Sequence, residues 1–205
     1  MKVCILAAGK GSRISAFGGR LHKALLPVGN EAVLTRIIRQ FPDGTEFVIA
    51  LGHRADQIRD YMAVVHPDLP VTFVEVDRIE GPGAGPGYSL RRCRPHLDGP
   101  FVFTSCDTLT GGPVPPPDRN WVGVHQVEDP SLWCTVVTDD LGRVVRLVYK
   151  RPEGSRLGFI GIAGIAQPEP FWRALDEASL AGEAQVDLVL AALAAAGLGT
   201  VELPS

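Results

Sequence analysis

The chain of 205 residues predicts a three-layer α/β/α sandwich around a mostly parallel, Rossmann-like sheet, with a small antiparallel part. Two uncharged apolar runs, at 3–6 and 47–51, are typical of strands that a parallel sheet buries on both faces. Residues 33–41 and 55–65 instead repeat their apolar side chains at helical spacing. Strands that alternate with helices in this way favour parallel pairing, with helices on both faces of the sheet.

The composition is typical of one globular domain, so we expect a single domain over residues 1–205, as a monomer or a homodimer. A net charge of −3 argues against nucleic acid as a partner. The four cysteines have no paired spacing, which favours reduced thiols over a zinc site or a disulfide framework. No apolar run reaches about 20 residues, and no leader sequence is visible, so we expect no membrane association and a cytoplasmic location.

The remaining elements follow from short apolar patterns and their breakers. Asp139-Asp-Leu-Gly142 is a predicted hairpin turn between two of the later strands. We expect the second half of the chain to extend the sheet and to supply the antiparallel part. The predicted strands are 71–76, 101–108, 121–127, 133–138, 143–149 and 159–165, and the last two helices are 169–180 and 183–196.

A glycine-rich turn follows the first strand, where Gly9 and Gly11 let the backbone approach a ligand closely. Lys10, Arg13 and Lys23 bring three cations to this turn, and glycine backbone with basic side chains at a strand end is typical of a phosphate site. The glycine spacing excludes a Walker A loop and leaves a dinucleotide fingerprint incomplete. The turn therefore predicts a nucleotide site of another kind.

Two further features point to the same edge of the sheet. Residues 80–87 contain four glycines and two prolines, and Gly85 and Gly87 open a predicted helix whose first amides are free to bind a ligand. Asp107 stands at the carboxyl end of a predicted central strand, where a carboxylate suits a ligand better than a core.

Leu6-Ala-Ala-Gly-x-Gly-x-Arg13, followed by Lys23-x-Leu-Leu-Pro27, resembles the signature of nucleotidyltransferases that join an NTP to a sugar phosphate or a similar metabolite. These enzymes form the MobA-like, nucleotide-diphospho-sugar transferase superfamily. The pattern from Gly52 to Ile58 also recurs in this family. Two positions depart from the family pattern: His22 stands where many members have proline, and Cys106 stands where glycine is usual.

The resemblance implies roles for individual residues, with an NTP and a phosphorylated small molecule as the partners and Mg²⁺ as the cofactor. Arg13 and Lys23 would be catalytic, Asp107 would bind Mg²⁺, and Lys150 would contact the acceptor phosphate. A second metal ligand is expected at Asp187 or Glu183. The residues expected to bind the nucleotide are Leu6, Ala7, Ala8, Gly9, Lys10, Gly11, Gly85 and Gly87.

The expected reaction is the attack of an acceptor phosphate on the α-phosphorus of the NTP, which releases pyrophosphate. A phosphate monoester is largely a dianion at neutral pH, so the reaction needs cations and positioning more than a general base. Two alternatives stay open: a molybdopterin guanylyltransferase, which the segments 18–26 and 106–108 resemble, and a nucleotide-binding regulatory module without catalysis. The sequence identifies neither the nucleobase nor the acceptor, which could be a sugar phosphate, phosphocholine or a phosphonate.

Overall fold

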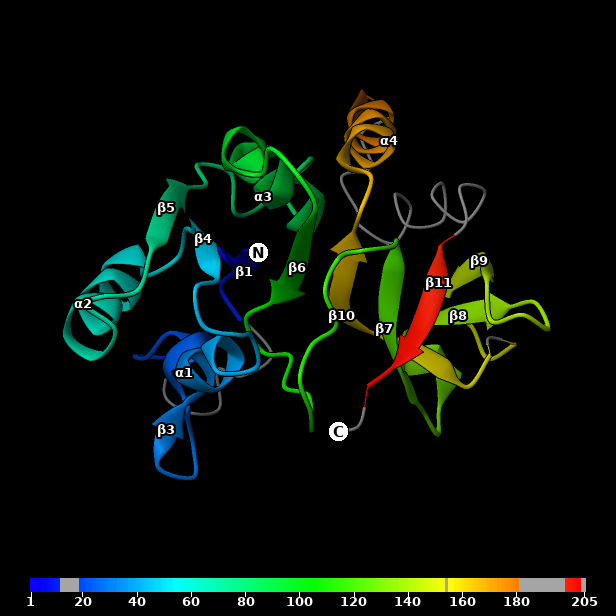
Figure 1. The fold of residues 1–205 in the computed structure, drawn as a ribbon, viewed down its shortest axis with the longest axis horizontal. Helices are drawn as coiled ribbons and strands as arrows, with labels where there is room; N and C mark the ends of the chain where they lie inside the picture. Colours follow the sequence, from blue (N-terminus) through cyan, green and yellow to red (C-terminus); the bar gives the residue numbers. More distant parts are fainter. Residues whose placement is uncertain (12–18, 154, 181–197, 204–205) are drawn as a thin grey trace.

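The computed structural model describes residues 1–11, 19–153, 155–180 and 198–203. Within these ranges one mixed sheet forms the centre of the molecule, and helices lie on both of its faces (Figure 1). The second helix expected near the C-terminus, at 183–196, lies outside the described residues. None of the described helices is long and apolar enough to span a membrane.

The strand order of the sheet is β11-β7-β10-β6-β1-β4-β5. β6, β1, β4 and β5 pair in parallel, and β11 pairs in parallel with β7, whereas β10 runs antiparallel to both β6 and β7. The prediction of a mostly parallel sheet is confirmed. The strands of this path are β1 (Lys2–Ala7), β4 (Glu46–Leu51), β5 (Val71–Glu75), β6 (Phe101–Ser105), β7 (Trp121–Gln126), β10 (Leu157–Ile165) and β11 (Gly199–Glu202).

The antiparallel part is a hairpin of β8 (Cys134–Thr138) and β9 (Val144–Tyr149). β8 also pairs with β10 through Thr135 and Gly158, which attaches the hairpin to the main sheet. The turn predicted at Asp139–Gly142 is present, and the Asp139 carboxylate accepts hydrogen bonds from the backbone of Leu141 and Arg143. The hairpin thus lies beside β10, next to the main sheet.

Alternation along β1 explains why the sheet is covered on both faces. Cys4 packs with α3 (Pro86–Cys93) and α4 (Pro168–Leu180), whereas Ile5 packs with α1 (Val33–Ile38) and α2 (Ala55–Val65). Successive side chains of a strand point to opposite faces, so one apolar strand supplies both cores. The described residues also contain short 3-10 helices at Lys23–Leu25, Arg94–His96 and Pro130–Leu132.

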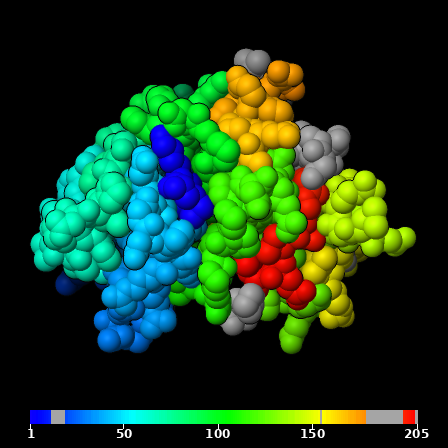
Figure 2. Space-filling view, in the orientation of Figure 1, coloured from blue at the N-terminus to red at the C-terminus, as the bar shows by residue number. Residues whose placement is uncertain are grey.

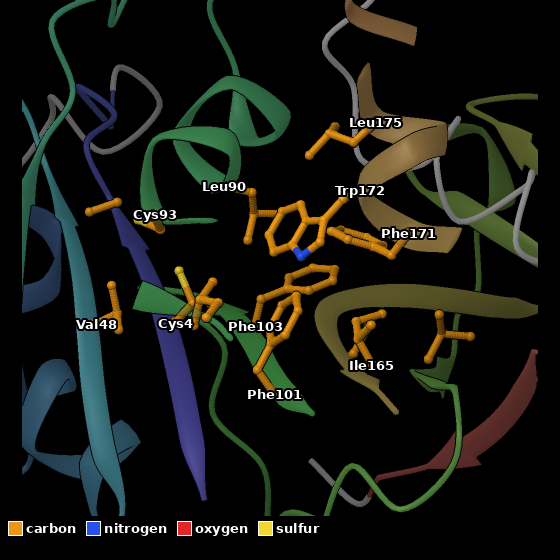
Figure 3. Packing of buried hydrophobic residues seen from close by; sticks show 14 of the residues in the cluster. Cys4, Val48, Leu90, Cys93, Phe101, Phe103, Ile165, Phe171, Trp172 and Leu175 are labelled. Carbon is orange, nitrogen blue, oxygen red and sulfur yellow. The ribbon is translucent and has the colours of Figure 1, made fainter. Parts of the chain in front are cut away.

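Aromatic side chains fix α4 against the sheet, as Figure 3 shows. Phe171 is fully buried, and its ring lies 5.8 Å from that of Phe101 and 6.0 Å from that of Phe103. Trp172 stacks on Phe101 at 5.3 Å with an angle of 12° between the rings. Aromatic pairs at these separations add to the stability gained from the apolar area that they bury.

Some boundaries differ from the sequence-based expectation. β6 ends at Ser105 instead of continuing to 108, so Asp107 lies in a turn beyond the strand. β11 and a short ribbon of β2 (Pro27–Val28) and β3 (Glu31–Ala32) were not expected. These segments are too short for a periodic pattern, and their strand conformation depends on the neighbour with which each one pairs.

In the space-filling view the N-terminal strand, in blue, lies between residues of the first half of the chain, and the red C-terminal residues lie beside later strands (Figure 2). β1 is thus surrounded by β4 and β6, both parallel to it, so the carboxyl ends of all three strands meet at one edge of the sheet. In open α/β sheets this edge is where ligands bind.

We predict that Phe171→Ala lowers the free energy of unfolding by about 3–5 kcal/mol, because it leaves a cavity between α4 and the sheet. Urea denaturation followed by circular dichroism measures this loss. Val64→Ala is the matched control, since Val64 is 80% exposed on α2 and its truncation should change stability by less than about 0.5 kcal/mol. Equal effects of the two substitutions would contradict the packing described for α4.

Candidate functional site

A cavity of about 560 Å³ opens at the carboxyl ends of β1 and β6. Both glycine-rich loops contribute to it, together with residues from the antiparallel hairpin and from β10. Residues from the first 30 positions and from the 80–90 segment therefore meet in one cavity, as expected from the sequence. The cavity is lined by Leu6, Ala8, Gly9, Lys23, Arg78, Ile79, Ala84, Gly85, Pro86, Ser89, Phe103, Ser105, Cys134, Tyr149, Phe159 and Gly161.

Four of the eight expected nucleotide-binding residues line this cavity, namely Leu6, Ala8, Gly9 and Gly85. The other four lie close to it without lining it. Ala7 is fully buried on the opposite face of the sheet, Gly87 is buried in the first turn of α3, Lys10 forms an ion pair of 2.7 Å with Glu80, and Gly11 lies against the Lys23 side chain.

Two glycines are needed for the shape of the first loop. Gly11 has a φ of +63°, and a Cβ atom there would come within 3.2 Å of the Lys23 side chain. Gly52, at the end of β4, would place a Cβ atom 2.6 Å from the carbonyl oxygen of Ala8. Glycine at these positions lets the loop turn and lets β4 close against it, with the His53 amide donating to the Ala8 carbonyl at 3.0 Å.

The second glycine loop ends at Gly85, whose φ of +147° is open to glycine and rare for other residues. α3 starts directly after it with Pro86, which has no amide hydrogen to satisfy. Ser89 donates its amide to the Gly85 carbonyl at 3.1 Å, and its side chain lines the cavity. The N-terminus of α3 thus faces the ligand space, where free amides favour polar or anionic groups.

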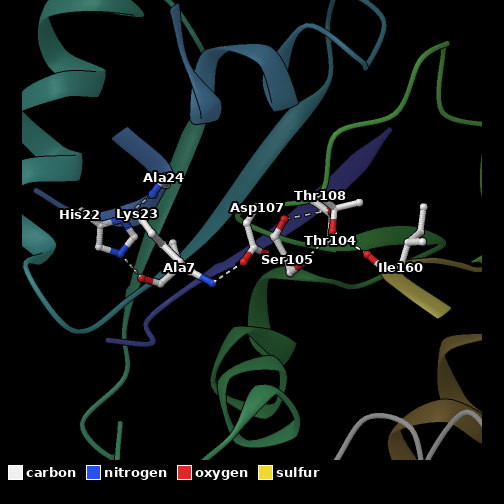
Figure 4. Close-up of polar contacts among 9 residues, drawn as sticks. All are labelled: Ala7, His22, Lys23, Ala24, Thr104, Ser105, Asp107, Thr108 and Ile160. Atoms are coloured by element: carbon white, nitrogen blue, oxygen red, sulfur yellow. Dashed lines mark hydrogen bonds and ion pairs between the residues drawn. The ribbon is translucent and has the colours of Figure 1, made fainter. Parts of the chain in front are cut away.

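Lys23 and Asp107 meet at the rim of the cavity, with 3.0 Å between Nζ and a carboxylate oxygen (Figure 4). They are 84 residues apart in the sequence and come from the loops that follow β1 and β6. The Lys23 side chain is 18% exposed and that of Asp107 is 45% exposed, so the pair stays open to a ligand while the lysine is held in place.

Burial by itself lowers the pKa of Lys23, but the neighbouring Cys106 and Asp107 outweigh it, so the pKa of Lys23 is raised. Burial raises the pKa of the Cys106 thiol to about 11, so Cys106 is neutral at physiological pH and Asp107 supplies the negative charge. Lys23 is consequently a stable cation. Cys106 packs in the buried core on the face of α1 and α2, which explains why a side chain larger than glycine is accepted there.

His22 ties the Lys23 turn to the first strand. It is 2% exposed, its Nε2 atom lies 3.0 Å from the carbonyl oxygen of Ala7, and its Nδ1 atom accepts a hydrogen bond from the Ala24 amide at 3.1 Å. The ring is therefore neutral, with the proton on Nε2. The φ of His22 is −64°, the angle that proline would impose, so histidine keeps the backbone course expected of the family residue.

Side chains from the first turn of α2 and from Arg54, which caps this helix, hold the same segment from the other side. Gln57 accepts a hydrogen bond from the His22 amide at 2.7 Å and donates to the carbonyl oxygen of Arg20 at 2.8 Å. The Arg54 guanidinium donates to the carbonyl oxygens of Gly19 and Arg20. The Gly52–Ile58 segment, noted for its family pattern, thus positions the residues that lead into Lys23.

Asp107 is positioned from the opposite side of the cavity. Ser105 and Thr108 share a hydrogen bond of 2.7 Å, and the Thr108 hydroxyl donates to the carbonyl oxygen of Ile160 at 2.6 Å (Figure 4). Gly161, with a φ of +85°, follows directly, and a Cβ atom there would lie 2.7 Å from Ser105 Oγ. The turn that carries Asp107 is therefore attached to β10.

Other predicted site residues are not brought into this arrangement by the described part of the structure. Lys150 is exposed and has a φ of +47°, and its Nζ lies 5.4 Å from the centre of the Tyr149 ring, which does line the cavity. Arg13, Asp187 and Glu183 lie outside the described residues. The part of the chain that the structure describes contains no group of three or more His, Cys, Asp or Glu residues that could hold a metal ion.

Sequence reasoning missed several side chains of the site, among them Ser89, Ser105, Tyr149 and Phe159. None of them belongs to a short motif, and each is brought to the cavity by its strand or helix. One signal was available: glycine within a strand pattern, as at Gly161, marks a bulge or a close backbone approach.

The model of the MobA-like NTP transferase domain matches residues 3–112, which is more than half of the chain. The chain belongs to the MobA-like NTP transferase family. The matched segment includes both glycine loops, Lys23 and Asp107, which form the cavity and its rim. The resemblance inferred from the sequence is confirmed.

Curated relatives of this NTP transferase chain include the bifunctional protein GlmU of Methanococcus aeolicus, which is 25% identical over 80% of the chain. The bifunctional IPC transferase and DIPP synthase of Archaeoglobus fulgidus is 32% identical over 52% of it. The chain spans 39% of the length of the first relative and 20% of the second.

Solved structures confirm the fold. A UDP-glucose pyrophosphorylase complexed with UDP-glucose superposes with a TM-score of 0.82 at 17% identity, covering 99% of this chain and 90% of its own. The inositol-1-phosphate CTP transferase from T. maritima superposes with a TM-score of 0.75 at 16% identity, covering 98% of this chain and 84% of its own. The α/β architecture is thus shared at low sequence identity.

We predict a pH-dependent loss of stability that depends on His22. Burial lowers the pKa of His22 from 6.5 to about 4, and the carbonyl of Ala7 only partly offsets this effect. The unfolded chain therefore binds a proton that the folded chain refuses, so stability falls as the pH drops from 6.5 towards 4, by about 3 kcal/mol in total.

Urea denaturation of the wild type and of His22→Gln at pH 7.0, 5.5 and 4.5 measures this effect. The variant will be less stable at pH 7.0, and its stability will fall less steeply than that of the wild type towards acid pH. Parallel curves would show that His22 does not carry the pH dependence.

Proposed function

We propose that this protein is a nucleotidyltransferase that transfers an NMP from an NTP to a phosphorylated small molecule and releases pyrophosphate. One observation carries the proposal: Lys23 and Asp107 form a 3.0 Å pair at the rim of a cavity that both glycine loops line. Family membership supports it, because this rim lies within the matched segment.

The cavity suggests how the NTP would lie. Ala8, Gly9 and Gly85 offer backbone and little side-chain bulk at one end, which suits a flat nucleobase, and the Ser89 hydroxyl lies nearby. The α-phosphate would then reach Lys23 at the rim. In this arrangement the β- and γ-phosphates extend towards the first glycine loop, where Lys10 is placed and where Arg13 follows in the sequence.

The chemistry assigned to these residues is charge neutralisation and positioning. The acceptor phosphate is already a dianion near neutral pH, so its oxygen attacks the α-phosphorus without a general base. Two anions must approach each other, and the Lys23 ammonium, whose raised pKa keeps it charged, reduces their repulsion. We assign Arg13 to the departing pyrophosphate and retain Lys150 for the acceptor phosphate.

The rim also fits Mg²⁺. This ion is commonly held by one or two carboxylates together with substrate phosphates, and the Asp107 carboxylate, 45% exposed beside Lys23, offers such a ligand. Asp187 or Glu183 would be the second carboxylate. Bound Mg²⁺ would supply positive charge for the phosphates, while Lys23 and the loop backbone hold the α-phosphate in place.

The names of relatives guide the choice of acceptors. One relative, from Bacillus subtilis, is a probable glucose-1-phosphate cytidylyltransferase, and one solved structure is an inositol-1-phosphate CTP transferase. Both names describe a phosphate monoester of a small alcohol as the acceptor. We extend this class of acceptor to the present chain and leave the alcohol and the nucleobase to experiment.

We predict pyrophosphate release with Mg²⁺ when four NTPs are crossed with hexose 1-phosphates, inositol 1-phosphate, phosphocholine, a phosphonate and molybdopterin. Lys23→Met and Asp107→Asn should each lower kcat by about 10²–10³-fold, the effect of removing one preorganised charge-stabilising group. Lys2→Met is the matched control, because Lys2 forms a similar pair of 2.5 Å with Asp98 at the opposite end of β1.

Normal turnover by Lys23→Met, with unchanged circular dichroism, would reject the assignment of the rim. If no combination releases pyrophosphate although an NTP binds, the protein is a nucleotide-binding regulatory module. If no NTP binds at all, the cavity is not a nucleotide site. Activity with molybdopterin and GTP alone would favour the guanylyltransferase alternative.

A further inference from the structure

A second cavity of about 500 Å³ lies on the Asp107 side of the site. It shares Ser105, Phe159 and Gly161 with the main cavity, so the two spaces adjoin across β10. Apart from Asp107 and Thr108, its other walls belong to none of the motifs noted in the sequence. The second cavity is lined by Ser105, Asp107, Thr108, Leu109, His125, Trp133, Phe159, Ile160, Gly161 and Leu203.

The walls of the second cavity are mainly aromatic and aliphatic. Trp133 is 40% exposed, and it lies beside β10, since a Cβ atom on Gly158 would be 3.5 Å from its ring. Two of the polar groups are already engaged, because the hydroxyls of Ser105 and Thr108 bond to each other and to the Ile160 carbonyl. The space therefore suits a ligand with an apolar or aromatic face.

His125 is the polar side chain whose environment points to a ligand. Its Nδ1 atom is buried and has no hydrogen-bond partner among the residues that the structure describes. Because His125 lines the second cavity and its Nδ1 is buried, Nε2 is the ring nitrogen that a ligand there can reach. The unpaired Nδ1 shows that the neighbouring protein groups do not fix this ring by a hydrogen bond there. The ring is therefore available to form its hydrogen bond with a molecule in the second cavity, which it lines.

The in-line geometry of nucleotidyl transfer indicates where the acceptor lies relative to the second cavity. The attacking and leaving oxygens lie roughly in line on opposite sides of the phosphorus. If pyrophosphate leaves over the Gly9–Gly11 loop, the attacking oxygen approaches from the Asp107 side of the Lys23 pair. The main cavity includes Gly9 and Lys23, whereas the second cavity includes Asp107, so the second cavity lies on the side of attack.

We propose that the second cavity holds the body of the acceptor, and that the acceptor is a phosphate monoester with an apolar or aromatic face and one group that hydrogen-bonds to His125. The inference rests on the proposed function and names the substrate class of that site. The acceptor phosphate oxygen forms a bond to the α-phosphorus, the bond from this phosphorus to the bridging oxygen breaks, and pyrophosphate departs with the electron pair. No proton transfer or redox partner is required.

A polyhydroxylated sugar fits these walls less well. Each hydroxyl placed against Trp133, Phe159 or Leu203 would lose its hydrogen bonds to water without regaining a partner. An aromatic ring would instead stack on Trp133 or Phe159, and its one polar group would meet His125. The preference of the site is thus set by walls that contain few free donors and acceptors.

Steady-state kinetics on the full chain tests the proposal, with 2-(4-hydroxyphenyl)ethyl phosphate, 2-phenylethyl phosphate and glucose 1-phosphate as acceptor probes. The hydroxyphenyl compound should have a kcat/KM about 10-fold above that of glucose 1-phosphate, and the loss of its hydroxyl should cost a further several-fold. His125→Ala should remove the difference between the two aromatic probes. A higher kcat/KM for glucose 1-phosphate would overturn the assigned substrate class.

Variants on the two sides of β10 locate the acceptor. Trp133→Leu and His125→Ala should raise the KM for the acceptor about 10-fold and leave the KM for the NTP unchanged, whereas Ser89→Ala should do the reverse. Tyr149→Leu probes the main cavity, which Tyr149 lines, and Leu141→Ala is the matched control, since Leu141 is 77% exposed and lines neither cavity. If Tyr149→Leu raises the acceptor KM while Trp133→Leu and His125→Ala do not, the acceptor lies in the main cavity and the proposal fails.

Binding separates this inference from the proposed function. In NMR titrations, 2-(4-hydroxyphenyl)ethyl phosphate should shift the His125 ring signal, which the His125→Asn spectrum assigns, and Trp133→Leu should abolish the shift. If no NTP supports transfer but this shift is seen, the second cavity still binds the aromatic phosphate and only the proposed reaction fails. Transfer without any shift at His125 would overturn the second cavity as the acceptor site.

Discussion

The ion pair between Lys23 and Asp107 is the interaction around which the site is built. An exposed pair of this kind contributes little to stability by itself, because solvent screens it. Its value lies in its position: β1 and β6 are parallel neighbours, so the loops that follow them emerge side by side at one edge of the sheet. The parallel pairing, fixed by an apolar core on both faces, is what brings a lysine and an aspartate from distant segments together.

Each partner of this pair is held by hydrogen bonds from a different part of the fold. On one side His22, Gln57 and Arg54 secure the segment that leads into Lys23. On the other side Thr108 attaches the Asp107 turn to β10. His22 also shows how a departure from a family pattern can be accommodated, since it adopts the backbone angle of proline and adds hydrogen bonds that proline could not make. This departure therefore gives no support to a loss of catalysis.

β10 lies between the main cavity and the second cavity, and it contributes residues to both. It is antiparallel to both of its neighbours, and its pairing with β7 is irregular between Phe159 and Ala163. Gly161, with its positive φ, lies within this irregular stretch and touches both cavities. A side chain at this position would press on Ser105, which lines both cavities. The irregular stretch of β10 thus lies where the nucleotide side of the site adjoins the side assigned to the acceptor.

The sequence by itself determined the fold class and the order of most strands and helices, because apolar periodicity is a local property of the chain. It also singled out Gly9, Lys23, Gly85 and Asp107, which the structure places at one cavity and its rim. It did not reveal β11 or the short ribbon, whose few residues become strands only beside a partner. Nor could it identify Tyr149, Phe159, Trp133 or His125 as cavity walls. Which face of a strand meets a cavity depends on register and on the neighbouring strand, and these are decided only when the whole sheet assembles.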